Sequence, residues 1–284
     1  MEIRLAKHAG FCFGVKKAVD TVYEQIESGE KIYTFGPIIH NDEVIRDMES
    51  KGVSVINDIA ELEKITEGRV IIRAHGVPRQ VEDKIRNMGV QYIDATCPFV
   101  KRIHKIVSEE SAAGKGILIT GNPLHPEVKG IVSWCSGPVY VIESREEASN
   151  TDFPKDMELT LVSQTTFNHK KFDDIVEILR SRGYNINIVN TICNATNERQ
   201  TEAEEIAEAA DVMIVIGGTS SSNTRKLYEI CKSKCENTYF VQTAEDLPQE
   251  YPEDTDIVGI TAGASTPKNI IEEVQTHVRT GTDI

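Results

Sequence analysis

Three of the six cysteines, Cys12, Cys97 and Cys193, occupy equivalent places in a pattern that recurs three times along the chain. Each follows a short apolar run and precedes residues with the apolar spacing of a helix. A polar residue comes 28 positions after each cysteine. These polar residues are His40, His125 and Ser221. Thiolates and imidazoles bind metals, and histidines and hydroxyls also bind anions, so the spacing points to a site built by three repeats.

The number of repeated cysteines restricts the kind of metal that they could hold. A single buried cysteine usually packs as a small apolar side chain, but three at equivalent positions before helix starts are typical of thiolate ligands. A structural zinc normally requires a fourth protein ligand, whereas iron–sulfur clusters are held by thiolates. We therefore expect Cys12, Cys97 and Cys193 to hold a 4Fe–4S cluster whose fourth iron is open to substrate. A structural zinc site remains an alternative.

The other three cysteines fall outside the repeat, and we expect them to pack against apolar neighbours. They are Cys135 and the pair Cys231 and Cys235, four positions apart on an expected helix.

Polar side chains gather where the strand-like runs end, and they form the candidate substrate site. Imidazoles, hydroxyls and an amide, together with backbone amides at helix starts, suit a diphosphate without a cluster of arginines. The alternative is that the histidines lie in turns and the hydroxyls cap helices, and a cap can also face an anion. The candidate binding residues are His40, His75, His125, Thr165, Ser221, Ser222, Asn223 and Ser265.

Glu127 lies two positions after His125 and is the candidate acid. An acidic residue there could simply complement the positive end of a helix. Beside a metal-bound hydroxyl, however, a carboxyl group whose pKa is raised by burial is a natural proton donor. We therefore expect Glu127, aided by His125 and Thr165, to carry the catalysis.

A basic stretch follows two of the repeated cysteines. It is either a solvated helix face or a docking patch for an acidic electron carrier. Its residues are Lys16, Lys17, Lys101, Arg102 and Lys105.

The elements that must position these side chains alternate between strands and helices. Such alternation predicts an α/β fold with parallel sheets, in which ligands bind beyond the carboxyl ends of the strands. We expect three pseudo-threefold-related α/β units with mostly parallel sheets around a central cluster cavity. The expected boundaries are 1–96, 97–192 and 193–284, with the strand at 3–6 closing the third unit.

Composition excludes several classes of protein. The 284 residues carry a net charge of −14, which disfavours a nucleic-acid partner, and 39% hydrophobic residues are ordinary for a globular chain. No apolar run reaches about 18 residues, so we expect no membrane span. The N-terminus carries no secretory signal, so we expect a cytoplasmic protein. The glycine motifs of dinucleotide and phosphate loops do not occur.

Short motifs along nearly the whole chain resemble those of the 4-hydroxy-3-methylbut-2-enyl diphosphate reductase family. They occur in family order between residues 9 and 265, and the segment around Cys193 is the loosest match. The motifs are Ala9-Gly-Phe-Cys-Phe-Gly-Val-Lys16, Gly36-Pro-Ile-Ile-His-Asn41, Arg73-Ala-His-Gly-Val77, Asp94-Ala-Thr-Cys-Pro98, His125-Pro-Glu127, Ser163-Gln-Thr-Thr166, Ser221-Ser-Asn223 and Thr261-Ala-Gly-Ala-Ser265.

The resemblance implies the last step of the non-mevalonate isoprenoid pathway. That reaction removes an allylic hydroxyl with two electrons and two protons to give isopentenyl and dimethylallyl diphosphates and water. The family's cluster ligands, diphosphate contacts and proton-relay acid fall on the residues named above. We expect reduced ferredoxin or flavodoxin to donate the electrons.

Three other functions compete with this expectation. A hydro-lyase acting on an open iron would require no reductant. An iron–sulfur sensor or electron carrier would have no use for the histidine, serine and asparagine side chains. A structural zinc protein would be colourless.

Overall fold

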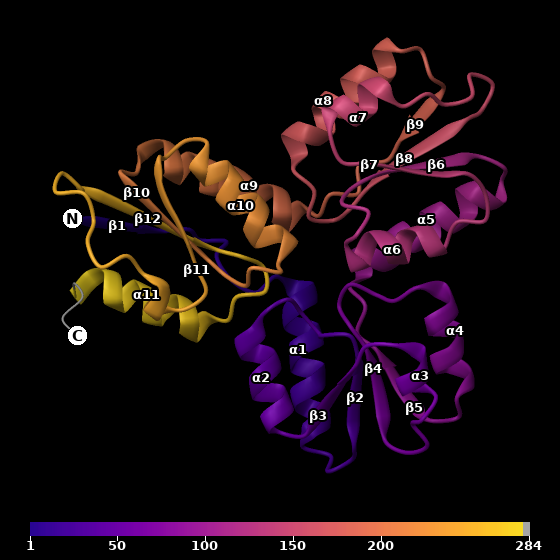
Figure 1. The fold of residues 1–284 in the computed structure, drawn as a ribbon, viewed down its shortest axis with the longest axis horizontal. Coiled ribbons are helices and arrows are strands. Elements are labelled where there is room, and N and C mark those ends of the chain that lie inside the picture. The colour runs from indigo at the N-terminus through magenta and orange to yellow at the C-terminus, as the bar shows by residue number, and fades with distance from the viewer. Residues whose placement is uncertain (281–284) are drawn as a thin grey trace. The chain divides into compact units, whose positions relative to one another are not determined.

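The computed structural model describes residues 1–280, in which three four-stranded sheets are interleaved with helices (Figure 1). All the described strand pairs are parallel, which confirms the predicted α/β class. The chain forms two compact units. One comprises Met1–Lys16, His40–Arg46 and Asn194–Ile284, and the other comprises Lys17–Ile39 and Asp47–Cys193. The last four positions of the expected third repeat lie outside the described residues.

The sheet formed within residues 32–94 has the strand order β3-β2-β4-β5. Its helices connect consecutive strands, as right-handed parallel crossovers require. The elements in chain order are α1 (Phe13–Ile26), β2 (Ile32–Phe35), α2 (Asp42–Ser50), β3 (Val53–Ile56), α3 (Ile59–Leu62), β4 (Arg69–Ile72), α4 (Arg79–Asn87) and β5 (Gln91–Asp94).

The next sheet has the order β7-β6-β8-β9 and lies in the same compact unit as the sheet before it. Its elements are α5 (Pro98–Ala112), β6 (Gly116–Thr120), α6 (Pro126–Ser133), β7 (Val139–Ile142), α7 (Arg145–Asn150), β8 (Leu159–Ser163), α8 (His169–Ser181) and β9 (Ile186–Ile188).

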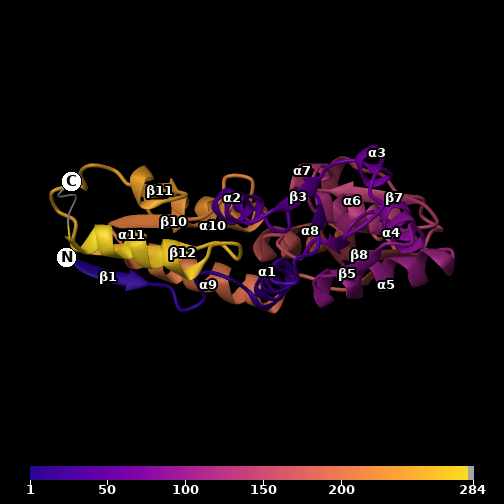
Figure 2. The same ribbon diagram turned by 90° about the horizontal axis from the view of Figure 1, so that it is seen from below.

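The remaining sheet takes its fourth strand from the N-terminus. Its order is β11-β10-β12-β1, and β1 pairs with β12 from Glu2 opposite Ile257 to Leu5 opposite Ile260 (Figures 1 and 2). The elements are β1 (Glu2–Leu5), α9 (Asn194–Ala209), β10 (Val212–Ile216), α10 (Ser222–Lys232), β11 (Asn237–Val241), a 3₁₀ turn (Ala244–Asp246), β12 (Ile257–Ala262) and α11 (Lys268–Thr280).

Each of the three sheets has the same order of strands and the same kind of hydrogen bond after its first strand. In each sheet the glycine after the first strand donates its backbone N–H to the carbonyl of the last residue of the second strand. These bonds are Gly36 to Ile56 (2.6 Å), Gly121 to Ile142 (3.0 Å) and Gly217 to Val241 (2.9 Å). The three glycines are therefore structurally equivalent.

Alternate residues of each buried strand face different helices. In β6, Leu118 packs with Phe172 and Ile175 of α8, whereas Ile117 and Ile119 pack with α5 and α6. Both faces of the sheet are thus covered, which explains why the strand is apolar throughout. In the described part of the chain, no helix is both long and apolar enough to cross a membrane.

Candidate active site

The repeated cysteines are fixed at equivalent points beyond the carboxyl ends of the strands. In each sheet the cysteine N–H donates to the carbonyl of the residue two positions after the third strand of the repeat. The bonds are Cys97 to Ala74 (2.9 Å), Cys193 to Thr165 (3.0 Å) and Cys12 to Ala264 (3.3 Å). Each cysteine also immediately precedes a helix, namely α5, α9 and α1 respectively. The structure thus places each of these cysteines next to a strand end, where the sequence predicted ligands.

The remaining cysteines occupy different surroundings. Cys135 packs in the core between α5, α6 and their sheet, while Cys231 and Cys235 pack between α9, α10 and theirs. Burial raises the pKa of the Cys135 and Cys231 thiols to about 12, which keeps them protonated. One detail of the sequence prediction was wrong, because α10 ends at Lys232 and leaves Cys235 beyond the helix.

Glu127 lies in the first turn of α6, and its carboxyl group is buried, with 1% of the residue exposed. The Thr165 N–H donates to Glu127 Oε1 (2.6 Å), and Thr165 Oγ1 donates to Oε2 (2.8 Å). Burial raises the pKa of Glu127 to about 7, although the bonds from Thr165 act to lower it. A carboxyl group with this pKa exists in both protonation states near neutral pH, as a proton donor requires.

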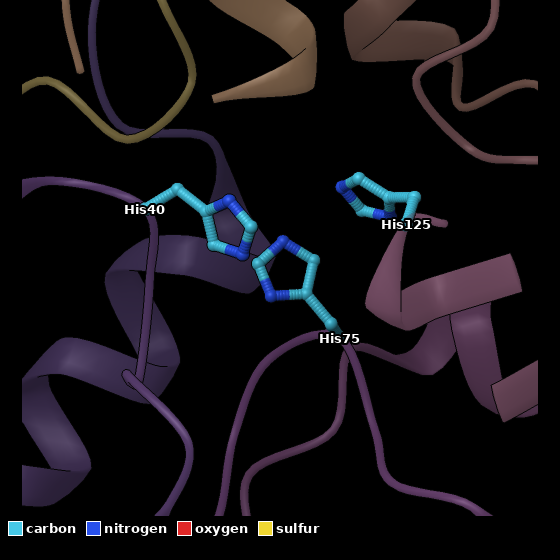
Figure 3. A group of neighbouring side chains, drawn as sticks. All are labelled: His40, His75 and His125. Carbon is cyan, nitrogen blue, oxygen red and sulfur yellow. The ribbon is translucent and has the colours of Figure 1, made fainter. Parts of the chain in front are cut away.

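His125 is the N-cap of α6, where its Nδ1 accepts the Glu127 backbone N–H (3.2 Å). A neutral imidazole that accepts at Nδ1 carries its proton on Nε2, so this ring presents a donor to a ligand. His75 follows β4, and its ring meets that of His125 edge to face with a centroid separation of 5.5 Å (Figure 3). These two histidines therefore form one group with Glu127 and Thr165.

His40 belongs to the other compact unit, where it lies among the serines of the predicted site. Its Nδ1 is 2.8 Å from the Ser220 carbonyl oxygen, which can only accept, so Nδ1 is the protonated nitrogen. Ser265 Oγ donates to the His40 carbonyl (3.0 Å) and lies 3.4 Å from Ser221 Oγ. The structure thus joins loops from three distant parts of the chain.

The start of α10 combines helix capping with unpaired polar atoms. Ser221 is the N-cap and accepts the Thr224 N–H (3.3 Å), as the capping alternative predicted. The Asn223 side chain is 4% exposed, yet its amide oxygen and nitrogen have no hydrogen-bond partner among residues 1–280. Buried amides are normally paired, so this position fits a polar ligand whose oxygen accepts from the amide N–H groups of Asn223. Ser222 is the first residue of the same helix.

Arg73 is a neighbour of the site that the sequence reasoning left without a role. Its Nε donates to the Gly76 carbonyl (3.2 Å), directly after His75, and burial lowers its pKa to about 10. Gly36 leaves space for the guanidinium, because a Cβ there would lie 2.2 Å from Arg73 Nη1. The positive φ of Gly36, 70°, gives a second reason for glycine.

Hydrogen bonding also changes how the repeat aligns at Thr165. Because Thr165 accepts from Cys193 as Ala74 accepts from Cys97, Thr165 corresponds to the residue before His75. Thr165 therefore aligns with Ala74 and Ala264, which also accept from the repeated cysteines, and not with His75 or Ser265. The side chain of Thr165 is therefore an addition to the repeat pattern, placed where its hydroxyl meets Glu127.

Within one compact unit the arrangement can bind an anion and transfer a proton. His75 and His125 lie together, and the buried carboxyl of Glu127 is joined through Thr165 to the backbone of Cys193. Within the other unit, the His40 and Ser265 loops meet the start of α10 beside the unpaired Asn223 amide. The first unit thus offers a place for a reacting polar group, and the second offers an anchor for an anion.

Comparison with known proteins identifies the family. A family model described as LytB protein matches residues 3–279. A 4-hydroxy-3-methylbut-2-enyl diphosphate reductase of Thermoanaerobacter sp. (strain X514) is 47% identical over 98% of this chain and 97% of its own. A relative of the same name from Alkaliphilus oremlandii is 42% identical over 96% of this chain and 98% of its own.

Solved structures agree with this result. The E-1-hydroxy-2-methyl-but-2-enyl-4-diphosphate reductase from Plasmodium falciparum matches with a TM-score of 0.90 and 30% identity, over 98% of this chain and 87% of that one. An (E)-4-hydroxy-3-methyl-but-2-enyl diphosphate reductase, described as the terminal enzyme of the non-mevalonate pathway, matches with a TM-score of 0.69 and 40% identity. That match covers 99% of this chain and all of the other. The chain therefore belongs to the LytB protein family, whose relatives compared above carry the reductase name.

Proposed function

We propose that this chain is a 4-hydroxy-3-methylbut-2-enyl diphosphate reductase that performs the last step of the non-mevalonate isoprenoid pathway. The carbon–oxygen bond of the allylic alcohol breaks with the uptake of two electrons and two protons. The products are water and isopentenyl or dimethylallyl diphosphate. The single observation that carries this proposal is the buried carboxyl of Glu127, which two bonds from Thr165 hold beside the backbone of a candidate cluster ligand, Cys193.

Cys12, Cys97 and Cys193 would hold a 4Fe–4S cluster as the three protein ligands. The donor set fits, because these three thiols lie at equivalent strand ends. Cys135, which is also half-buried, and the buried Cys231 and Cys235 pack against apolar cores instead. When bound, the cluster supplies the electrons and an uncapped iron that polarises the hydroxyl. The proposal requires the repeats 1–96, 97–192 and 193–284 to bring their cysteines to one cluster.

The chain's own residues would anchor the substrate through its diphosphate. Neutral imidazoles, hydroxyls, an amide and helix-start N–H groups bind phosphate oxygens without a large positive charge. Binding energy from this remote group would orient the allylic carbon and help exclude water. The proposed anchors are His40, His75, His125, Ser221, Ser222, Asn223 and Ser265, while Thr165 would contact the substrate hydroxyl end.

Glu127 would then protonate the leaving hydroxyl so that it departs as water. Its raised pKa keeps a usable proton near neutral pH, and His125 and Thr165 hold its backbone and carboxyl in place. Turnover should therefore fall as the pH rises above about 7, where Glu127 is ionised.

An anaerobic assay with a reduced viologen dye and the hydroxylated allylic diphosphate tests the function. We expect dye oxidation at two electrons per molecule of water released, with isopentenyl and dimethylallyl diphosphates as products. Product formation without reductant would instead indicate a hydro-lyase, and diphosphate binding without turnover would indicate a binding protein.

Replacing each repeated cysteine with serine tests the cluster ligands. We expect Cys12→Ser, Cys97→Ser and Cys193→Ser to lower iron and sulfide content, because serine binds iron less well than thiolate. The matched control is Cys135→Ser, which alters a thiol in a core and should leave iron and sulfide unchanged in the folded protein. Equal iron content in all four variants would contradict the assignment.

A further inference from the structure

The first turns of α5 present cations and an aromatic ring to solvent directly beside Cys97. We call this surface the α5 basic face. Cys97 is the N-cap of α5, and Pro98 is the first helical residue. The face consists of Pro98, Phe99, Lys101, Arg102 and Lys105, all of which are exposed. Residues on the opposite side of the helix, such as Val100 and Ile103, are buried in the core. The cations thus lie on one side of α5, the helix whose N-cap is the candidate cluster ligand Cys97.

The charge of α5 stands out when the three helices that follow the repeated cysteines are compared. The helix after Cys193, α9, contains five glutamates and one arginine, and Arg199 is 3% exposed because it points to the backbone of His8 and Gly10. In α1 the pair Lys16 and Lys17 is balanced by Asp20 and Glu24, whereas the cations of α5 lie in its first turns and its glutamates, Glu109 and Glu110, come only toward its end. The chain as a whole carries −14. The α5 basic face is therefore a local positive region on an acidic protein.

The reaction requires an external electron source of a particular kind. Each turnover consumes two electrons, and the sequence has no glycine motif for a nicotinamide or flavin dinucleotide. A protein that carries one electron at a time must then dock twice, briefly, beside a cluster ligand. Transient redox complexes use small interfaces, and opposite charges on the two surfaces accelerate their encounter.

We propose that the α5 basic face is the docking surface for an acidic one-electron carrier protein. This inference rests on the proposed function, because it assumes that Cys97 holds the cluster to be reduced. The carrier loses one electron at each docking event, and two such events with two protons convert the allylic alcohol to alkene and water. The exposed ring of Phe99, 39% exposed, supplies apolar contact next to Cys97.

The cations of the face differ in how far they are neutralised by neighbours. Lys101 pairs with Asp94 at 2.5 Å, and Lys105 lies 3.8 Å from Glu109. Arg102 forms no ion pair within residues 1–280. Arg102 and the weakly paired Lys105 are therefore the groups that would attract an acidic partner, and they are the positions to change.

A comparison of two electron donors on the cluster-loaded, full-length protein tests the proposal. The variant is Arg102→Glu combined with Lys105→Glu. The matched control is Lys64→Glu combined with Arg180→Glu, which makes the same charge change at exposed positions. Lys64 precedes β4, and Arg180 lies in the last turn of α8, so both are at the opposite ends of strands and helices from Cys97. The donors are a purified acidic bacterial ferredoxin and reduced methyl viologen.

We expect the α5 variant to lose about tenfold or more in kcat/KM for ferredoxin at low salt, because like charges now face each other. Its rate with methyl viologen and its iron content should match the wild type. The wild-type ferredoxin rate should fall as salt rises, and the variant should lose most of that dependence. The control variant should behave as the wild type with both donors.

Two results would overturn the docking proposal. One is an unchanged ferredoxin rate in the α5 variant across the salt series, and the other is an equal loss with ferredoxin and methyl viologen. A wild-type protein that does not turn over with methyl viologen would instead contradict the proposed function. Titrating ferredoxin against wild type and variant by calorimetry then still decides the docking proposal, with weaker binding of the variant expected.

Discussion

Glu127 shows how one residue can be tuned by opposing effects. Burial penalises the carboxylate and raises its pKa to about 7, while two hydrogen bonds from Thr165 partly stabilise the charged form. When the group is protonated, its O–H can donate to Thr165 Oγ1 instead. A single threonine therefore serves both protonation states, which suits the proposed role of Glu127 as a group that loses and regains a proton in every cycle.

We expect Glu127→Gln to abolish most turnover and to change the pH dependence of stability. Because the folded-state pKa is raised, the wild type is stabilised below the unfolded pKa of 4.5 and loses that stability as the pH rises through about 7. Glutamine does not ionise. The free energy of unfolding of the variant, measured in urea, should therefore rise relative to that of the wild type by about 3 kcal/mol between pH 4.5 and pH 8.

Thr165→Val provides the control for this prediction. Removing the hydroxyl removes one of the bonds that lower the pKa of Glu127, so the upper limb of the pH–rate profile should move to higher pH. If the limb stays where it is in the wild type, Glu127 is not the group that titrates there.

His125 combines a capping role with a proposed anchoring role, and two substitutions separate them. His125→Ala removes the acceptor for the Glu127 N–H and should lower the free energy of unfolding by about 1 kcal/mol. His125→Asn keeps a good N-cap and should retain most of that stability. Both variants should raise KM for the diphosphate substrate in the dye assay. An asparagine variant with wild-type KM would show that the imidazole only caps the helix.

At the scale of elements, the same capping arrangement recurs in the acidic segments of the repeats. A cap residue is followed three positions later by an acid whose carboxylate accepts the N–H of the residue before the cap. The sets are Asn57-Asp58-Glu61, Glu143-Ser144-Glu147 and Gln242-Thr243-Asp246. Reciprocal capping satisfies backbone N–H groups that a short helix otherwise leaves unpaired. The acidic character of these segments thus has a local structural cause.

The capping sets predict a loss of stability without a loss of function. Asp58→Ala and Ser144→Ala should each lower the free energy of unfolding by about 1 kcal/mol, measured by urea denaturation. Turnover with the dye should remain at the wild-type level, because α3 and α7 carry none of the proposed site residues. A lower kcat in either variant would show that these short helices shape the site.

The period of the apolar residues and the spacing of the cysteine repeat were sufficient to predict most of the helices and strands. The alternation of strands and helices, and the recurring distance from Cys12 to His40, reflect contacts within one repeat, which leave a periodic trace in sequence. The bond between Thr165 and Glu127 joins residues 38 positions apart and has no counterpart in the repeat, so the sequence pointed to both residues but not to the bond between them. The same holds for Arg73, whose place is visible only once the positive φ of Gly36 brings two strand-end loops together.

For the molecule as a whole, the most consequential feature is the pairing of β1 with β12. Glu2 to Leu5 complete a sheet whose other strands lie beyond residue 211. The N–H of Cys12 donates to the Ala264 carbonyl, so the segment between β1 and α1 is joined to the loop that contains Ser265. The order of these strands along the chain therefore differs from their order in the sheet.

Deleting residues 1–6 should weaken the sheet of β10, β11 and β12 and leave the other two sheets nearly intact. Hydrogen exchange should speed up in β12, whose edge would lose its partner strand, but not in β2 or β6. Bound iron should also fall, because Cys12 loses its neighbouring support. Uniform exchange rates across all three sheets would contradict this expectation.

The pairing of β1 with β12 also determines when this sheet can be completed during synthesis on the ribosome. The first strand to emerge is among the last to find its neighbour, since β12 is translated about 250 residues later, roughly tens of seconds at ordinary elongation rates. During that interval β1 has no partner strand, while the sheets of β2 and β6 can already close. The leading end of the nascent chain thus stays unpaired until the trailing end is made, and the proposed cluster ligand Cys12 gains its partner Ala264 only then.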